Sequence, residues 1–273
     1  MLVPLWLPPV VRAVLTALLV LTASVLANRL GPFWGGLVAS LPVSAGPTYV
    51  FLALDHDPGF VATSALASAA TNAATGLFLI VYGVLAQRGL VLSLAAAAAA
   101  WLAAAVVIAQ VAWTPTTVML VNVAVSSAGA VILPAAALAA PPGVREAPRS
   151  RDTEIFRAVM VALFVSAVVF GSRWLDPAVT GIVALFPVTF LSLFVLVHPR
   201  QGAAACAAMA ASSLRAMFGF GLMLLVLHLA IAPLGVAAAL CLALLTALVW
   251  SAALLVAAER RRRQAVIVTT ASR

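Results

Sequence analysis

The feature that most constrains this chain is a series of long apolar segments separated by short polar connections. A helix of about 20 residues rises about 30 Å, which matches the hydrocarbon core of a bilayer. Only 8% of the 273 residues are charged, whereas soluble surfaces need far more. The sequence therefore predicts an all-α integral membrane protein surrounded by lipid bilayer. Nine transmembrane helices are expected, at residues 8–27, 33–54, 59–86, 90–109, 115–140, 156–172, 177–197, 203–231 and 235–258.

Arginine placement predicts the orientation in the membrane, because cytoplasmic connections carry an excess of positive charge. The chain has fifteen arginines and no lysine. If "ERRRRQ" is cytoplasmic, twelve arginines lie on that side and two, Arg12 and Arg173, lie outside. We therefore expect a bacterial-type cytoplasmic (inner) membrane protein with its C-terminus in the cytoplasm and its N-terminus outside. The arginines form no patch with aromatic neighbours, so no nucleic-acid partner is expected.

An internal repeat is visible when the chain is compared with itself at a shift of 145 residues. Thirteen of the thirty-four residues from Val11 are identical to those from Phe156, with Pro42 on Pro187. One repeat period holds five spans, an odd number, so the second copy enters the membrane from the opposite face. The sequence thus predicts two inverted-topology repeats, at 1–140 and 156–273, joined by a charged cytoplasmic linker at 141–155.

The second helix of each predicted repeat contains prolines that break or kink it. A proline inside a helix removes one backbone hydrogen bond, so broken membrane helices persist where protein or a water-lined cavity satisfies the freed groups. The first break is dense in small and polar residues: Pro42, Ser44, Gly46, Pro47 and Thr48. The second has Pro187 and Thr189 only, so a kink is expected there. A packing kink without ligand is the ordinary alternative, but paired breaks in inverted halves favour a substrate site.

The third span carries a polar face, and its repeat partner carries a charge. Helical spacing places on one side Ser64, Ser68, Thr71 and Thr75, with Asn72 at the edge. Such small hydroxyl residues more often indicate close helix packing than ligand binding. Asn72 aligns with Arg215, which lies thirteen residues after Gly202. We expect Arg215 to face an internal cavity near Asn72, with an anionic substrate as its counter-charge, because no carboxylate lies in any predicted span. A later start of the eighth helix, near Met209, would instead leave Arg215 close to the headgroups.

Two further sites carry weaker signals. His228, near the outer end of the eighth span, is a candidate proton-coupling group, although a satisfied interfacial histidine is the commoner outcome. The outward "DHDPG" contains Asp55, His56 and Asp57, which are weak candidates for metal ligands. A solvated turn is the commoner reading of such a segment.

These features predict a secondary transporter or facilitator of a small, anionic organic solute that binds between the repeats near the membrane midplane. The expected binding residues are Arg215, Asn72, Pro42, Ser44, Gly46, Thr48, Pro187, Thr189, Thr71 and Ser68. No cofactor is expected, no enzyme activity is favoured, and a homo-oligomer is compatible with the sequence. The alternatives are a membrane-embedded enzyme acting on a lipid-linked substrate at the outer face, with Asp55, His56 and Asp57, or a non-catalytic membrane subunit.

The arginine distribution makes one prediction that needs no structure. A reporter enzyme that is active only in the cytoplasm should be active when fused after Arg273, because nine spans with this charge bias place the C-terminus inside. Activity of a periplasm-specific reporter at the same position would contradict the expected orientation.

Overall fold

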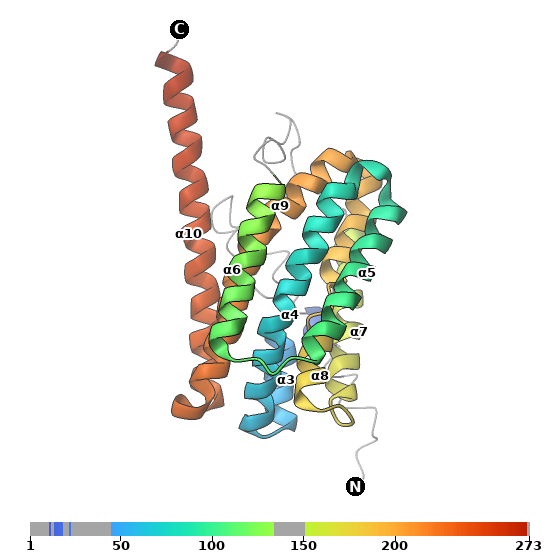
Figure 1. Cartoon of the computed structure of the whole chain (residues 1–273), viewed down its shortest axis with the longest axis vertical. Coiled ribbons are helices and arrows are strands. Elements are labelled where there is room, and N and C mark those ends of the chain that lie inside the picture. The colour runs from blue at the N-terminus through green and yellow to red at the C-terminus, as the bar shows by residue number, and fades with distance from the viewer. Residues whose placement is uncertain (1–10, 12–13, 19–21, 23–44, 134–150, 272–273) are drawn as a thin grey trace.

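A computed structural model describes residues 11, 14–18, 22, 45–133 and 151–271, and within these residues every regular element is a helix (Figure 1). The elements are α3 (Ala45–Asp55), α4 (Pro58–Leu85), the 3₁₀ turn η1 (Ala86–Arg88), α5 (Leu90–Ala109), α6 (Pro115–Ile132), α7 (Arg151–Gly171), α8 (Pro177–Ala184), α9 (Val188–Leu234) and α10 (Val236–Ala271).

Five helices in the described part of the chain are long and apolar enough to cross a membrane. They cover Pro58–Arg88, Leu90–Ala109, Pro115–Ile132, Pro177–Leu234 and Val236–Arg260. Large apolar side chains such as Val91, Leu120 and Val249 are exposed on their surfaces, as lipid-facing residues would be. The prediction of an all-α membrane-embedded protein is confirmed at this level.

Helix starts follow local sequence signals that were readable in advance. Phe60 N donates to Asp57 Oδ1 at 3.1 Å and Val179 N donates to Asp176 Oδ1 at 3.0 Å, so each aspartate caps the helix that follows it. Proline occupies the next position in both, where the missing N–H is not needed. The predicted starts at 59, 115 and 177 are therefore correct to within one residue.

One predicted helix end is wrong, and one helix continues beyond its predicted membrane span. Helix α6 ends at Ile132 rather than 140, since Leu133 precedes Pro134 and a residue before proline disfavours helical geometry; residues 134–140 lie outside the described part. The apolar span of α10 covers Val236–Arg260, close to the predicted 235–258, and the helix itself continues to Ala271. Its arginines are good helix formers, so hydropathy shows where the apolar part ends but not where the helix ends.

Helix α9 makes two passes, because the chain reverses at Gly202, whose φ of 80° and ψ of 173° are not helical. Contacts with α4 show the reversal. Early in α9, His198 Nδ1 lies 2.6 Å from the hydroxyl of Tyr82, near the end of α4. Late in α9, His228 Nδ1 lies 2.8 Å from the carbonyl of Ala62, near the start of α4. The limb after Gly202 therefore runs antiparallel to α4, as Figure 1 shows.

The second predicted break is a full interruption of the helix. Helix α8 ends at Ala184, α9 begins at Val188, and the residues between them are not helical. The expectation of a mere kink at Pro187 is corrected. Pro187 has φ −78° and ψ 47°, and Val188 N donates to the carbonyl of Phe186 at 2.7 Å, so a tight turn replaces the helical bonds.

Helix α4 lies at the centre of the bundle, because small residues let its neighbours approach closely. A Cβ atom on Gly181 of α8 would clash with the carbonyl oxygen of Ser64 and meet the Ala67 side chain at 2.9 Å. Backbone–backbone approach of this kind is the usual device of membrane helix interfaces. Thus α4 and α8 touch where neither bears a large side chain.

This contact predicts a difference between two glycine substitutions. Gly181→Ala should lower the thermal unfolding midpoint of the detergent-purified protein, because its added methyl group meets backbone that cannot yield, an overpacking cost of about 1–3 kcal/mol. Gly46→Ala is the matched control, since no atom of the described residues lies within 4 Å of its added Cβ atom. Equal midpoints for the two variants would show that the close contact between α4 and α8 is not present.

Candidate functional site

The interrupted helix is held by hydroxyl groups on one face of α4. Ser64 Oγ donates to the carbonyl of Pro177 at 2.9 Å, and Ser68 Oγ donates to that of Gly181 at 2.7 Å. At the break itself, Thr75 Oγ1 donates to the carbonyl of Leu185 at 3.2 Å. The break thus leaves a carbonyl that α4 satisfies, so the packing interpretation of the hydroxyl face holds for these residues.

Aromatic side chains cover the same break. Trp101 Nε1 of α5 donates to Thr75 Oγ1 at 3.2 Å, and the Trp101 ring meets Phe186 edge-on at 5.2 Å between centroids. Phe164 of α7 lies 6.1 Å from the ring of Phe186. The non-helical turn is therefore enclosed by side chains from the first and second predicted repeats.

A hydroxyl relay lies about two turns earlier along α4, at Ser68. The hydroxyl of Tyr49, on α3, lies 2.6 Å from Ser68 Oγ and is fully buried. Because Ser68 uses its own proton on Gly181, Tyr49 is the donor to Ser68. The predicted residue Thr71 instead donates to the carbonyl of Ala67 in its own helix at 2.8 Å, and Thr48 is buried on α3.

Asn72 forms a buried amide pair with Asn122 of α6. Asn72 Nδ2 donates to Asn122 Oδ1 at 2.7 Å and to the carbonyl of Met217 at 2.8 Å. Asn122 Nδ2 donates to the carbonyls of Ala69 and Val118. All four amide protons are used, yet Asn72 Oδ1 is buried with no hydrogen-bond partner. Buried polar atoms are nearly always paired, so this unpaired oxygen is an exception among the amide groups of the pair.

Arg215 lies on the opposite side of its helix from this pair. Its side chain is exposed, whereas Leu214 and Gly221 face α4 and α6: Leu214 contacts Gly129, and Gly221 has no room for a Cβ atom beside Asn72 Nδ2. Adjacent residues are separated by about 100° around a helix, so Arg215 points away when Leu214 points in. The expectation that Arg215 faces the interior beside Asn72 is corrected.

The two proline segments can be compared only in part. Pro42 and Ser44 lie outside the described residues, and Gly46 and Pro47 lie in the first turn of α3, where proline is tolerated. Thr189 is in the first turn of α9, and its carbonyl accepts a hydrogen bond from Ser192 Oγ at 3.0 Å. Of the predicted residues, Ser68 and Asn72 lie on α4, whose Thr75 holds the turn before Pro187, and Arg215 is not among these contacts.

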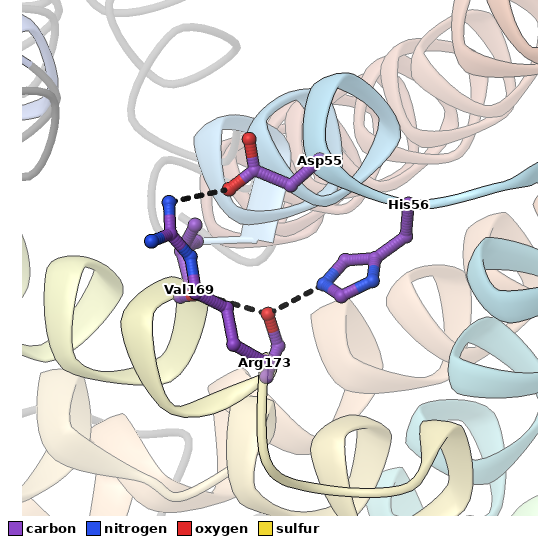
Figure 2. A network of polar contacts seen from close by, with 5 residues as sticks. Asp55, His56, Val169 and Arg173 are labelled. Atoms are coloured by element: carbon purple, nitrogen blue, oxygen red, sulfur yellow. Dashed lines mark hydrogen bonds and ion pairs between the residues drawn. The ribbon is translucent and has the colours of Figure 1, made fainter. Parts of the chain in front are cut away.

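A polar network links α3 to α7 at the end of the bundle where α4 begins (Figure 2). His56 Nε2 lies 2.7 Å from Ser172 Oγ, and Ser172 Oγ donates to the carbonyl of Val169 at 2.7 Å. Since the serine proton is used on Val169, His56 Nε2 carries the proton that joins the two side chains. Asp55 Oδ2 lies 3.9 Å from an Arg173 nitrogen, and His56 stacks on Phe60 at 3.8 Å.

This network explains the "DHDPG" segment without a metal. Asp55, His56 and Asp57 have three different partners, namely Arg173, Ser172 and the backbone N–H of Phe60. Among the residues that the structure describes, no group of three or more His, Cys, Asp or Glu side chains could hold a metal ion. Asp57 acts as a helix cap, which is the ordinary role of aspartate before proline.

The other two histidines are His228, for which the sequence suggested a role, and His198, for which it did not. His228 is part-buried, and its Nδ1 donates to the carbonyl of Ala62, which agrees with a satisfied interfacial histidine. The sequence gave no reason to single out His198, yet its Nδ1 lies 2.6 Å from the Tyr82 hydroxyl, and Tyr82 stacks on Phe194 at 3.7 Å. The only available signal was the pairing of a tyrosine and a histidine near the same predicted membrane face.

Comparison with known proteins gives no relative from which a role could be transferred. No family model matches the chain, and no curated protein and no solved structure matches it. Any functional conclusion therefore depends on the contacts described above.

The amide pair predicts non-additive losses of stability. Asn72→Leu and Asn122→Leu should each lower the thermal unfolding midpoint, because each leaves buried polar groups without partners, at about 1–3 kcal/mol. The double variant should lose less than the sum of the two, since both partners are then apolar. Thr246→Ala, whose exposed hydroxyl bonds only to Leu242 of its own helix, is the control. Strictly additive losses would contradict the pairing.

Proposed function

We propose that the chain is a secondary transporter or facilitator of a small solute that binds between two inverted repeats beside the turn at residues 185–187. The observation that carries this proposal is the interruption of an apolar helix inside the bundle, between α8 and α9. Non-helical backbone at membrane depth occurs where protein or a cavity satisfies it, and discontinuous helices commonly form the substrate sites of transporters.

The arrangement of the described helices supports an inverted repeat. The second limb of α9 aligns in sequence with α4 and runs antiparallel to it, and Asn72 Nδ2 reaches the carbonyl of Met217 across their contact. Both helices are followed by a glycine of positive φ, Gly89 at 99° and Gly235 at 77°, and then by another apolar helix. Equivalent segments that run in opposite directions are the mark of repeats related by an axis in the membrane plane.

The chemistry of the proposed site favours a solute with hydrogen-bonding groups. Asn72 Oδ1 on α4 and Thr180 Oγ1 on α8 are two of the four buried side-chain atoms that have no hydrogen-bond partner in the described part of the chain. The N-terminus of α9 begins at Val188 and carries the partial positive charge of a helix start, which favours an anionic group. The anionic class of the proposed solute now depends on this helix start and no longer on Arg215.

The network of Figure 2 supports alternating access as the mechanism. It joins α3, from the first proposed repeat, to α7, from the second, through His56–Ser172 and Asp55–Arg173. If one repeat rocks against the other, this end of the bundle opens only when these contacts break. On this proposal, the two contacts keep the end of the bundle where α4 begins closed.

The alternative functions draw less support from the contacts. An enzyme at the outer face would need Asp55, His56 and Asp57 to converge, but each has its own structural partner. A non-catalytic membrane subunit requires no interrupted helix and no unpaired amide oxygen in the bundle. Transport remains the proposal that uses both features.

The test is a ligand screen followed by uptake into proteoliposomes. Small organic anions are screened for a rise in the thermal unfolding midpoint of the purified protein, because a ligand of the folded state must stabilise it. Uptake of a labelled hit should then be lost in Pro187→Ala, whose helix can continue across the break. Pro233→Ala is the matched control, since Pro233 is exposed near the end of α9, far along the chain from the break.

The proposal predicts uptake by the wild-type protein and by Pro233→Ala but not by Pro187→Ala, with all three equally folded by circular dichroism. Equal uptake by all three would show that the break is not the site. Uptake of no solute by the wild-type protein, together with no stabilising anion, would contradict transport of this solute class.

A further inference from the structure

Exposed arginines gather at one end of the described bundle, where α4 ends. Arg88 is the last residue of the 3₁₀ turn η1 that follows α4, and its side chain is exposed. Arg200, which is also exposed, lies two residues after His198, whose Nδ1 contacts Tyr82 near the end of α4. Both arginines therefore lie at the end of the bundle opposite to the network of Figure 2.

Helix α10 brings further arginines to the same end. Trp250, fourteen residues after the start of α10, donates through Nε1 to the carbonyl of Arg215, nineteen residues before Leu234 at the end of α9. A contact this far from the connecting turn on both sides means that α10 runs antiparallel to the second limb of α9. The apolar span of α10 ends at Arg260, ten residues beyond Trp250. Those ten residues, about 15 Å of helix, lead back towards Gly202, where the second limb begins.

Four arginines follow one another where this apolar span ends. They occupy positions 260–263, and the backbone of α10 stays helical through them to Ala271. Figure 1 shows this last part of α10 extending beyond the neighbouring helices. Successive positions of a helix lie about 100° apart, so four in a row are distributed around the axis and not along one side. Four positively charged positions thus encircle the helix directly after its apolar span.

Carboxylates at this end offset only part of the positive charge. Glu259 directly precedes the four arginines. Helix α7 also begins at this end, since Ser172, just after its last residue, lies 2.7 Å from His56 at the other end. Its first two turns carry two arginines and two carboxylates, and so add no net charge: Arg151, Asp152, Glu154 and Arg157. At the opposite end of the described bundle, three carboxylates accompany one arginine: Asp55, Asp57, Asp176 and Arg173. The end where α4 ends is therefore the positive one.

This position favours anionic phospholipid headgroups as the binding partner. The four arginines begin where the apolar span ends, so they lie at the level of the headgroups when that span occupies the hydrocarbon core. Clusters of about four to eight basic residues next to a membrane helix attract anionic lipids. A single-stranded nucleic acid would need aromatic side chains on which its bases could stack, and residues 251–273 include none.

We propose that the end of the bundle formed by Arg88, Arg200 and the arginines at 260–263 binds the phosphate groups of anionic phospholipids, with α10 as the main point of attachment. A guanidinium suits this role because it forms paired, charge-assisted hydrogen bonds with phosphate oxygens and stays protonated at any accessible pH. The proposal uses no solute site and no internal repeat, so it is independent of the proposed transport function.

The test measures which lipid gathers around the full-length protein. The protein carries a fluorescent donor after Arg273 and is placed in phosphatidylcholine nanodiscs that contain a trace of lipid with an acceptor label on its acyl chain. The labelled lipid is either phosphatidylglycerol or, as the matched control, phosphatidylcholine with the same label. Two variants replace all four arginines at 260–263, one with glutamine and one with lysine. Both replacements are good helix formers, and lysine keeps the charge.

In the wild-type protein, energy transfer should show that phosphatidylglycerol is enriched over phosphatidylcholine by about fivefold or more, the effect of a single basic residue near an anionic surface. The lysine variant should keep this preference and the glutamine variant should lose most of it, with equal helix content by circular dichroism.

Equal transfer to the two lipids in the wild-type protein would overturn the proposal, and this comparison requires no variant. An undiminished preference in the glutamine variant would overturn it as well. Displacement of phosphatidylglycerol by micromolar oligouridylate would identify a soluble polyanion as the partner and would likewise contradict the proposal. No uptake is measured, so failure here is distinguishable from failure of the transport proposal.

Discussion

Hydrogen bonds from the hydroxyl face of α4 to backbone carbonyls of the α8–α9 segment hold this bundle together. Ser64, Ser68 and Thr75 each reach a carbonyl of the interrupted helix. In hydrocarbon no water replaces a lost backbone partner, and each unsatisfied group costs several kcal/mol. The interruption between Ala184 and Val188 therefore depends on α4, and the position of every element that packs on α8 depends on it as well.

The same constraint determines which residues α4 and its neighbours can use. Hydroxyls reach across to a neighbouring backbone only where the helices approach closely, and Gly181 and Gly221 permit that approach. Where α4 meets α6 and the second limb of α9, an amide makes the interhelical hydrogen bonds instead of a hydroxyl. Asn72 donates to Asn122 Oδ1 and to the Met217 carbonyl. One helix face thus joins both predicted halves, while the contacts at its beginning, through His56 and Asp55, involve groups that can separate in water.

Three described carboxylates lie at helix ends, where Asp57 and Asp176 cap helices and Asp55 meets Arg173. Arg215 lies thirteen residues after Gly202, within the second limb of α9, and its side chain is exposed. An interior Arg215 would have suggested an anionic substrate, and an exposed Arg215 removes that argument.

The sequence by itself determined the membrane class, the starts of most described helices and the place of the second break. Those features depend on local rules: apolar length, an aspartate or threonine cap followed by proline, and the lost backbone bond at Pro187. Tertiary structure alone decided that the break is a complete interruption, that Asn122 pairs with Asn72, and that Tyr82 meets His198. It also placed Arg215 on the outer face, since the repeat alignment matched residue positions but not the direction in which a side chain points around its helix. Such directions follow from how helices pack around α4, and no local pattern in an apolar sequence specifies that packing.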